Sequence, residues 1–453
     1  MEVKEFELSK EYYEWLEHAI AADEKEAIRQ SMEHIYPADV STLLYEFDTQ
    51  DSKYVLDLLD IELAAEIISN LDPEIRKKFL KNFTSEEIAE FIDYVDSDDA
   101  ADILNEQPVI TREEVIALME NQEKAGNIVD LLRYEEDCAG GLMAKELIKA
   151  NVNWRVVQCI EEIRRQAEKV SKFYSVYVVD NQGILIGRVS LKKIILSNDD
   201  TLIQDIYEPD IISVETYRKD VEVAEIMKRY DLEAIPVVNV QGRLLGRITI
   251  DDILDVITEQ AEMERQMMAG ITENIEEDDS IWMLSRARLP WLIVGMIGGI
   301  LGAEFIGLFE RDLTIVPAMA FFIPLINATG GNVGIQSSSI VLQSLVNKSA
   351  FESSFGQRII KTLLVALING LVISSLVFAS NIMLGKPNTL AMVVSIALFS
   401  VVILASFMGT FTPIILDKLK INPALASGPF ITTANDLIGL AVYFSVAHFL
   451  YSI

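Results

Sequence analysis

Five long apolar blocks occupy the C-terminal part of the chain, at about 290–309, 314–346, 359–384, 388–416 and 424–449. An α-helix rises ~1.5 Å per residue, so about 20 residues cross the hydrocarbon core of a lipid bilayer. The pattern therefore predicts five transmembrane helices, with prolines interrupting the second and the fourth. Irregular backbone at membrane depth is tolerated where it is buried in protein or lines a cavity.

Basic residues flank these blocks mainly on one side of the membrane. Arg286 and Arg288 precede the first block, and Lys418 and Lys420 lie between the fourth and the fifth. Cytoplasmic loops carry an excess of Lys and Arg. We therefore expect a multi-pass protein of the cell membrane with its large N-terminal part in the cytoplasm and its C-terminus outside. Five spans, an odd number, are consistent with a symmetric dimer.

Two acidic residues, Glu304 and Asp436, lie within the apolar blocks. A carboxylate at this depth costs at least ~2.5 kcal/mol and needs a partner, water or a function. Glu304 is near the outer end of its block and can reach the interface. Asp436 belongs to a small and polar stripe on one helix face, which comprises Gly428, Thr432, Asn435, Asp436 and Gly439. The stripe favours an ion pathway over the alternative, a face that only joins helices.

The second block contains a glycine- and amide-rich segment at 324–336. Such a segment exposes backbone carbonyls at membrane depth, and rings of carbonyls form ion filters. We expect the pore to be lined by five residues from this segment and the fifth block, namely Gly331, Asn332, Thr432, Asn435 and Asp436. Close packing of small residues is the alternative for the segment.

Residues 36–107 repeat with a period of 12, and the units begin at Tyr36, Asp48, Asp60, Asp72, Thr84 and Asp96. Twelve residues allow one short helix and a tight turn, so stacked units predict an α-helical solenoid over 1–132. Asp98 and Asp102 lie four positions apart in the last unit and face the same way. Two like charges there are unfavourable without a cation, although a solvated helix start is also credible for Asp98.

A second repeat aligns residues 179–195 with 238–254. A Val-rich strand, a glycine turn, a second strand and a helix occur twice, which resembles a tandem pair of cystathionine-β-synthase (CBS) modules over 133–257. In that family, a Ser/Thr and an Asp of the signature hold a nucleotide. Thr249 and Asp252 match in the second copy, whereas the first has Ser190 and Lys193. The resemblance thus implies nucleotide binding, with ATP a candidate, or a purely structural pair.

Charge divides the chain in the same way as hydropathy. The net charge is −32, yet residues 290–453 contain seven basic and six acidic side chains, so the acidic excess lies before Pro290. These features exclude a nucleic-acid binder, a disordered chain and a simple cytosolic enzyme. The two cysteines, Cys138 and Cys159, lack the spacing of a zinc site. No nucleophile–base arrangement or phosphate-binding glycine loop indicates catalysis.

The order of an acidic solenoid, a CBS pair, a connecting helix over 258–285 and five membrane helices over 286–453 resembles the MgtE family of magnesium channels. Local motifs strengthen the resemblance at 134–143 (YEEDCAGGLM), 330–336 (GGNVGIQ) and 433–440 (TANDLIGL). The resemblance implies a homodimer in the lipid bilayer that passes Mg²⁺ between the second and fifth helices. Asp436 of each chain would be the filter carboxylate.

The resemblance also implies cytosolic Mg²⁺ sites at Glu66, Asp98, Asp102, Asp231, Asp252 and Asp255. Glu259 and Glu262 extend the acidic face of the connecting helix, and we include them as candidate ligands. The acidic domains of a dimer repel one another, so bridging divalent ions favour a compact, closed state and their loss opens the pore. Transport of Co²⁺ or Mn²⁺ stays an alternative, as does a membrane-anchored nucleotide or metal sensor that conducts nothing.

Overall fold

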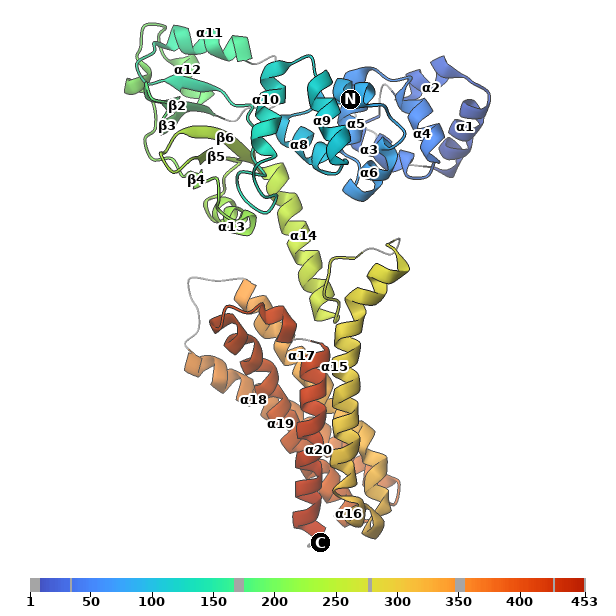
Figure 1. Cartoon of the computed structure of the whole chain (residues 1–453). Helices are drawn as coiled ribbons and strands as arrows, with labels where there is room; N and C mark the ends of the chain where they lie inside the picture. The colour runs from blue at the N-terminus through green and yellow to red at the C-terminus, as the bar shows by residue number, and fades with distance from the viewer. Residues whose placement is uncertain are drawn as a thin grey trace. The chain divides into compact units, whose positions relative to one another are not determined.

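The computed structural model describes residues 9–32, 35–166, 175–275, 279–346, 355–426 and 428–451. Two compact units make up the chain, Met1–Ile257 and Thr258–Ile453, and each is described by itself (Figure 1). The first unit contains a helical domain followed by two small sheets with their helices. The second unit contains the long apolar helices.

Short helices with regular spacing form the start of the first unit. They are α1 (Lys10–Ala21), α2 (Lys25–Met32), α3 (Pro37–Leu44), α4 (Thr49–Leu56), α5 (Ile61–Ser69), α6 (Pro73–Leu80), α7 (Ser85–Ile92), α8 (Ser97–Asn105), α9 (Val109–Leu118) and α10 (Gln122–Leu131). The six predicted unit starts are the N-cap residues of α3 to α8. Side chains at these positions can cap the helix starts. Thr84, for example, forms a capping box with Glu87 at the start of α7.

The 12-residue period is also the period of the core in this helical domain. Buried apolar side chains recur once per unit at Leu43, Val55, Ile67, Phe79, Phe91 and Ile103, and again one position later in each unit. Alternate helices pack together, for example α3 on α5 and α5 on α7. Each unit therefore buries its apolar pair against its neighbours, as a solenoid requires.

Two βαββα modules complete the first unit. The first has β1 (Lys149–Asn151), α11 (Val156–Gln166), β2 (Val176–Val179), β3 (Leu185–Val189) and α12 (Leu191–Leu196), followed by a short turn, η1 (Ile203–Asp205). The second has β4 (Val214–Glu215), α13 (Asp220–Tyr230), β5 (Ala234–Val238), β6 (Leu244–Thr249) and α14 (Ile250–Met268). Each sheet pairs its first two strands in parallel and the last two as an antiparallel hairpin. This is the repeat predicted from the sequence.

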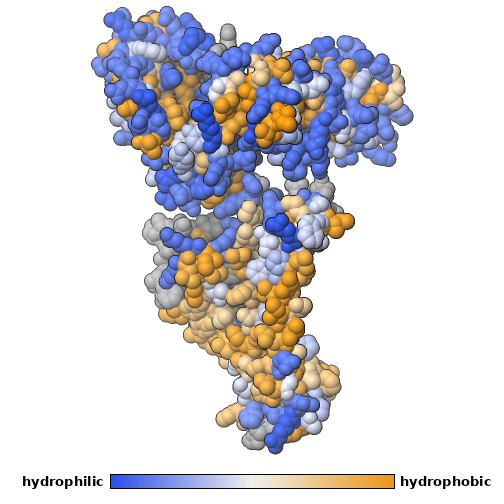
Figure 2. Space-filling view, viewed as in Figure 1, coloured by the Kyte–Doolittle hydropathy of each residue, from blue (hydrophilic) through white to orange (hydrophobic). Residues whose placement is uncertain are grey.

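The second unit contains α15 (Ile281–Gly307), α16 (Glu310–Ile315), η2 (Pro317–Phe322), α17 (Ile323–Val346), α18 (Phe355–Met383), α19 (Asn388–Lys418), η3 (Pro423–Ala426) and α20 (Pro429–Tyr451). Among the described residues, five helical segments are long and apolar enough to cross a membrane, in line with the prediction. Figure 2 shows hydrophobic side chains gathered over these helices, whereas hydrophilic side chains dominate the N-terminal part. The chain therefore has the features of a multi-pass membrane protein.

Two boundaries differ from the sequence expectation. The first membrane helix begins at Ile281 and not near residue 290, because the Ser280 hydroxyl caps it by accepting a hydrogen bond from Met283 N. The predicted linker up to residue 285 is thus shorter. Pro317 confines the start of the second span to the 3₁₀ turn η2 before α17 begins. Tyr443 secures this turn, since its hydroxyl donates to Met319 O at 2.9 Å.

Candidate functional site

Helices α17 and α20 approach closely through the glycines of the predicted filter segment. A Cβ atom on Gly331 would lie 3.1 Å from Cγ2 of Thr432 and 4.0 Å from Oδ1 of Asp436. A Cβ atom on Gly334 would lie only 1.9 Å from Nδ2 of Asn435. The glycines therefore allow the polar face of α20 to pack against α17, and the structure brings Gly331, Thr432 and Asp436 together.

Asp436 lies half-buried in the N-terminal half of α20. Neither α17 nor α20 contains a Lys or Arg, so these two helices provide no fixed countercharge for its carboxylate. The Thr432 hydroxyl, one turn earlier, donates to Gly428 O of its own helix at 2.9 Å. An anionic oxygen at this depth needs a cation or water as its partner.

Asn435 is buried, with 2% of its surface exposed, and neither its amide oxygen nor its amide nitrogen has a hydrogen-bond partner among the described residues. The side-chain oxygen of Asn327 on α17 is likewise buried and unpartnered there. Leaving such a group unpaired costs about 1–3 kcal/mol, and an ion or ordered water is the usual remedy. Amide oxygens are suitable partners for hydrated Mg²⁺.

Asn332 differs from the other predicted pore residues because it is exposed on the surface of the single chain. It belongs to an exposed row on α17 with a spacing of four residues, which comprises Pro324, Ala328, Asn332, Gln336 and Ile340. The structure thus separates the predicted set into a packed part, around Gly331 and Asp436, and an outward-facing part.

An acidic cluster forms in the first unit where the solenoid meets the CBS pair. Burial raises the pKa of Asp98 on α8 well above its usual range, and the nearby Asp252 carboxylate raises it further. Burial also raises the pKa of Asp252 to about 6, although its Oδ2 accepts hydrogen bonds from Thr249 N at 2.9 Å and Thr249 Oγ1 at 2.8 Å. The structure therefore brings together two predicted ligands from different domains.

A separate contact holds the start of α8 in this position. Glu146, which precedes β1, accepts hydrogen bonds from Ser97 N at 3.1 Å and Ser97 Oγ at 2.7 Å. Ser97 Oγ in turn accepts from Lys145 N at 2.9 Å. The approach of Asp98 to Asp252 is therefore maintained by neutral and charge-assisted bonds next to it, in spite of the repulsion between the two carboxylates.

The remaining predicted ligands are dispersed. Asp102 keeps solvent contact, yet packing around its carboxyl and the neighbouring Asp99 raise its pKa to about 7. Glu66 on α5, Asp231 at the left-handed C-cap of α13, and Asp255, Glu259 and Glu262 on α14 are exposed. Within the described part of the chain, no group of three or more His, Cys, Asp or Glu side chains is arranged to hold a metal ion.

Asp99 was missed by the sequence reasoning as a site residue. Burial raises the pKa of its carboxyl, and Asp96 and Asp251 raise it further. Its position directly after Asp98 was visible in the sequence, but its distance from the start of α14 was not.

The two nucleotide signatures of the CBS pair have different surroundings. In the first, Ser190 caps α12 by accepting from Lys193 N at 3.3 Å, and Lys193 Nζ pairs with Glu208 at 3.0 Å. In the second, Thr249 and Asp252 bond to each other at the start of α14. Both cysteines, Cys138 and Cys159, are free and buried.

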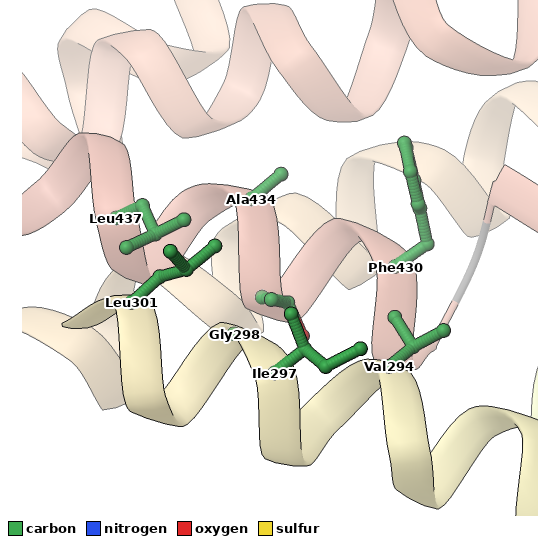
Figure 3. Close-up of a pocket in the computed structure, with 8 residues that line it drawn as sticks. Val294, Ile297, Gly298, Leu301, Phe430, Ala434 and Leu437 are labelled. Carbon is green, nitrogen blue, oxygen red and sulfur yellow. The ribbon is translucent and has the colours of Figure 1, made fainter. Parts of the chain in front are cut away.

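An apolar groove of about 240 Å³ lies between α15 and α20 (Figure 3). Its lining comprises Val294, Ile297, Gly298, Leu301, Phe430, Thr433, Ala434 and Leu437. None of the predicted pore residues lies in it. A Cβ atom on Gly298 would lie 1.9 Å from Cγ2 of Thr433, so Gly298 allows α15 to pack against α20. The groove is a feature of helix packing beside the candidate pore.

Three family models match successive parts of the chain. The model described as the MgtE intracellular N domain matches residues 35–137, the CBS domain model matches 203–259, and the model described as a divalent cation transporter, MgtE, matches 323–446. A magnesium transporter MgtE of Thermus thermophilus is 34% identical over 441 residues, which cover 96% of this chain and 97% of the relative. The chain belongs to the MgtE family.

Two further MgtE relatives and two solved structures agree with this assignment. The magnesium transporter MgtE of Enterococcus faecalis is 35% identical, and the match covers 72% of this chain and 72% of the relative. The magnesium transporter MgtE of Bacillus subtilis is 29% identical, and the match covers 92% of this chain and 93% of the relative. A cytosolic domain of the Mg²⁺ channel MgtE in complex with ATP is 33% identical, with a TM-score of 0.51 over 53% of this chain and 98% of that structure. The soluble part of a magnesium transporter has the same TM-score at 28% identity, and the match covers 56% of this chain and 99% of that structure. These relatives and structures are named as magnesium transporters or channels, and the predicted family and fold class are confirmed.

Proposed function

We propose that the chain transports Mg²⁺ across the cell membrane through a pore lined by α17 and α20. The observation that carries this proposal is Asp436, a half-buried carboxylate at membrane depth beside the glycine face of α17. The names of the MgtE relatives favour Mg²⁺ over Co²⁺ or Mn²⁺ as the substrate. A membrane anchor without transport would need neither the carboxylate nor the unpaired Asn435.

The pore requires a second copy of the chain in this proposal. The exposed row on α17 that contains Asn332 and Gln336 is polar in part, and a polar face toward lipid is costly. A two-fold axis beside α17 and α20 would cover this row and place one Asp436 from each chain across a shared pathway. Mg²⁺ dehydrates reluctantly and prefers six oxygens at about 2.1 Å, so such a pathway suits an ion that keeps part of its water.

The acidic residues of the cytoplasmic part serve as the Mg²⁺ sensor. Asp98 and Asp252 lie close together, and both have raised pKa values. A divalent ion between them would relieve the repulsion between their carboxylates. We assign Glu66, Asp102, Asp231, Asp255, Glu259 and Glu262 to the same regulation. Because these residues are dispersed, the ions would bridge separate elements, favour one compact state and close the pore by negative feedback.

The CBS pair provides a second input. Thr249 and Asp252 are the residues proposed to hold the ribose of a nucleotide such as ATP, since a related cytosolic domain was solved with ATP. Ser190 is a weaker candidate because it caps α12 beside the Lys193–Glu208 pair. We propose that the first unit lies in the cytoplasm and the C-terminus outside, and the basic flanks of the membrane helices support this orientation.

Ion flux into proteoliposomes tests the pore, with internal Mg²⁺ varied from micromolar to millimolar. Asp436→Asn is expected to abolish Mg²⁺ flux, whereas Glu304→Gln, a matched change in the first span, is expected to retain it. Suppression by internal Mg²⁺ in the wild type, and relief by Asp98→Asn, would support the sensor. Unchanged flux in Asp436→Asn would place the pathway elsewhere, and absence of flux from folded wild-type protein would favour the anchored sensor.

A further inference from the structure

The second CBS module contains a buried arginine whose side chain has an unpaired nitrogen among the described residues. Arg247 on β6 has 3% of its surface exposed, and its Nε is buried with no hydrogen-bond partner among the described residues. Its backbone is satisfied, since Arg247 and Ala144 exchange two hydrogen bonds at 2.9 and 2.8 Å. The unpaired buried donor is therefore Nε of the guanidinium group and not a backbone group of the strand.

A guanidinium group keeps its proton in proteins, so it cannot escape the cost of burial by becoming neutral. A buried charge is normally paired, and one left without a partner destabilises the fold. Burial also raises the pKa of the adjacent Tyr177 to about 12, against the opposing effect of Arg247 and Arg188. Arg247 therefore places a fixed positive charge beside a buried tyrosine.

The internal repeat of the CBS pair provides a comparison within the chain. Arg188 on β3 is the counterpart of Arg247, because Arg188 pairs with Tyr177 across the first hairpin as Arg247 pairs with Pro236 across the second. Arg188 exchanges two backbone hydrogen bonds with Glu208, at 3.0 and 2.7 Å, as Arg247 does with Ala144. Glu208 and Ala144 therefore occupy equivalent positions beside the two arginines.

The neighbouring glycines confirm that these positions correspond. A Cβ atom on Gly187 would lie 2.3 Å from the Glu208 carbonyl oxygen, and one on Gly246 would lie 2.6 Å from the Ala144 carbonyl oxygen. The side chains at the two positions differ in chemistry. Glu208 pairs with Arg188 Nε at 3.4 Å, whereas the methyl group of Ala144 offers no acceptor. The second module thus retains the arginine but lacks its carboxylate.

We propose that Arg247 binds the phosphate group of a small anionic ligand, which takes the place of the missing carboxylate. A planar guanidinium matches phosphate oxygens with two parallel hydrogen bonds. Thr249 lies two residues further along the same strand face, about 7 Å away at ~3.3 Å per residue, which is within the length of a nucleotide. If the ligand is a nucleotide, the inference rests on the ribose site proposed at Thr249 and Asp252. Free phosphate would need Arg247 alone.

Thermal unfolding of the full-length protein in detergent tests the proposal, with ATP, adenosine and inorganic phosphate titrated at constant free Mg²⁺. We expect ATP or phosphate, but not adenosine, to raise the unfolding temperature of the wild type. Arg247→Met should weaken this binding by at least about tenfold. The same substitution should raise the unfolding temperature without ligand, because it removes an unpaired buried charge.

Arg188→Met is the matched control, since Arg188 already has Glu208 as its partner. This variant should keep the ligand-induced shift and gain no stability. Thr249→Val distinguishes a nucleotide from free phosphate as the ligand. If ATP no longer raises the unfolding temperature of this variant while phosphate still does, the ligand is a nucleotide. If ATP and phosphate both raise it as in the wild type, the ligand is phosphate alone. The proposal is overturned if neither ligand stabilises the wild type, or if Arg247→Met leaves the shift intact. Because the assay reads binding, a failure of Mg²⁺ flux leaves its outcome unaffected.

Discussion

Gly409 on α19 is the position where an added methyl group would most directly displace the candidate filter helix. A Cβ atom there would lie 2.3 Å from the backbone oxygen of Gly334 and 2.9 Å from Cβ of Ser337, both on α17. Real contacts of this kind rarely fall below 3.0 Å. The carbonyl belongs to the helix backbone, so no side-chain rotation relieves the clash, and α17 must move away from α19.

The expected cost of Gly409→Ala follows from this contact. Overpacking a tight interface costs about 1–3 kcal/mol, and the gain from replacing a helical glycine by alanine, about 1 kcal/mol, offsets only part of it. The displacement of α17 also moves Gly331 relative to Asp436. We therefore expect an unfolding temperature lower by several degrees in detergent, together with reduced Mg²⁺ flux in proteoliposomes.

Gly299→Ala on α15 is the control for this prediction. A Cβ atom at Gly299 would meet nothing within 4 Å, so this variant gains the same helix propensity without a clash. It should match or exceed the wild type in unfolding temperature and retain flux. The reasoning is refuted if Gly409→Ala unfolds and transports like Gly299→Ala, because the backbone contact would then be unimportant.

Two further predictions concern the first unit. Glu106 pairs with the buried Arg76, and Arg76 Nε lies 3.0 and 3.1 Å from the two carboxylate oxygens of Glu106. Glu106→Gln should therefore lower the free energy of unfolding in denaturant by about 3–5 kcal/mol. A loss below about 1 kcal/mol would contradict the burial of this pair. In chelator, the first unit should lose stability as pH rises from about 4 to 7, because the folded state holds protons on Asp98, Asp102 and Asp252 that the unfolded chain releases at lower pH. Asp98→Asn should flatten this profile, whereas Glu62→Gln, at an exposed position of α5, should not. A profile that rises over the same range would refute the raised pKa values.

Periodic features of the sequence translated directly into structure. The 12-residue spacing predicted the N-caps from Tyr36 to Asp96, since each cap depends on residues of its own unit, and each apolar pair packs against units that repeat the same pattern. The apolar blocks predicted five membrane spans because length and hydropathy are local properties. The boundary near Ile281 was misplaced, since a helix that continues beyond the apolar block leaves no signal in hydropathy.

Contacts between distant segments were decided by the tertiary structure. The sequence marked Asp98 and Asp252 separately, but only the docking of α8 beside Lys145 and Glu146 brings them together. Arg247 looked like an ordinary strand residue, because its burial and its missing carboxylate depend on a neighbour more than 100 positions away. Local patterns thus determined the elements and the family of this protein. The pairing of charges, and hence the candidate sites, depended on how those elements pack, which no single segment encodes.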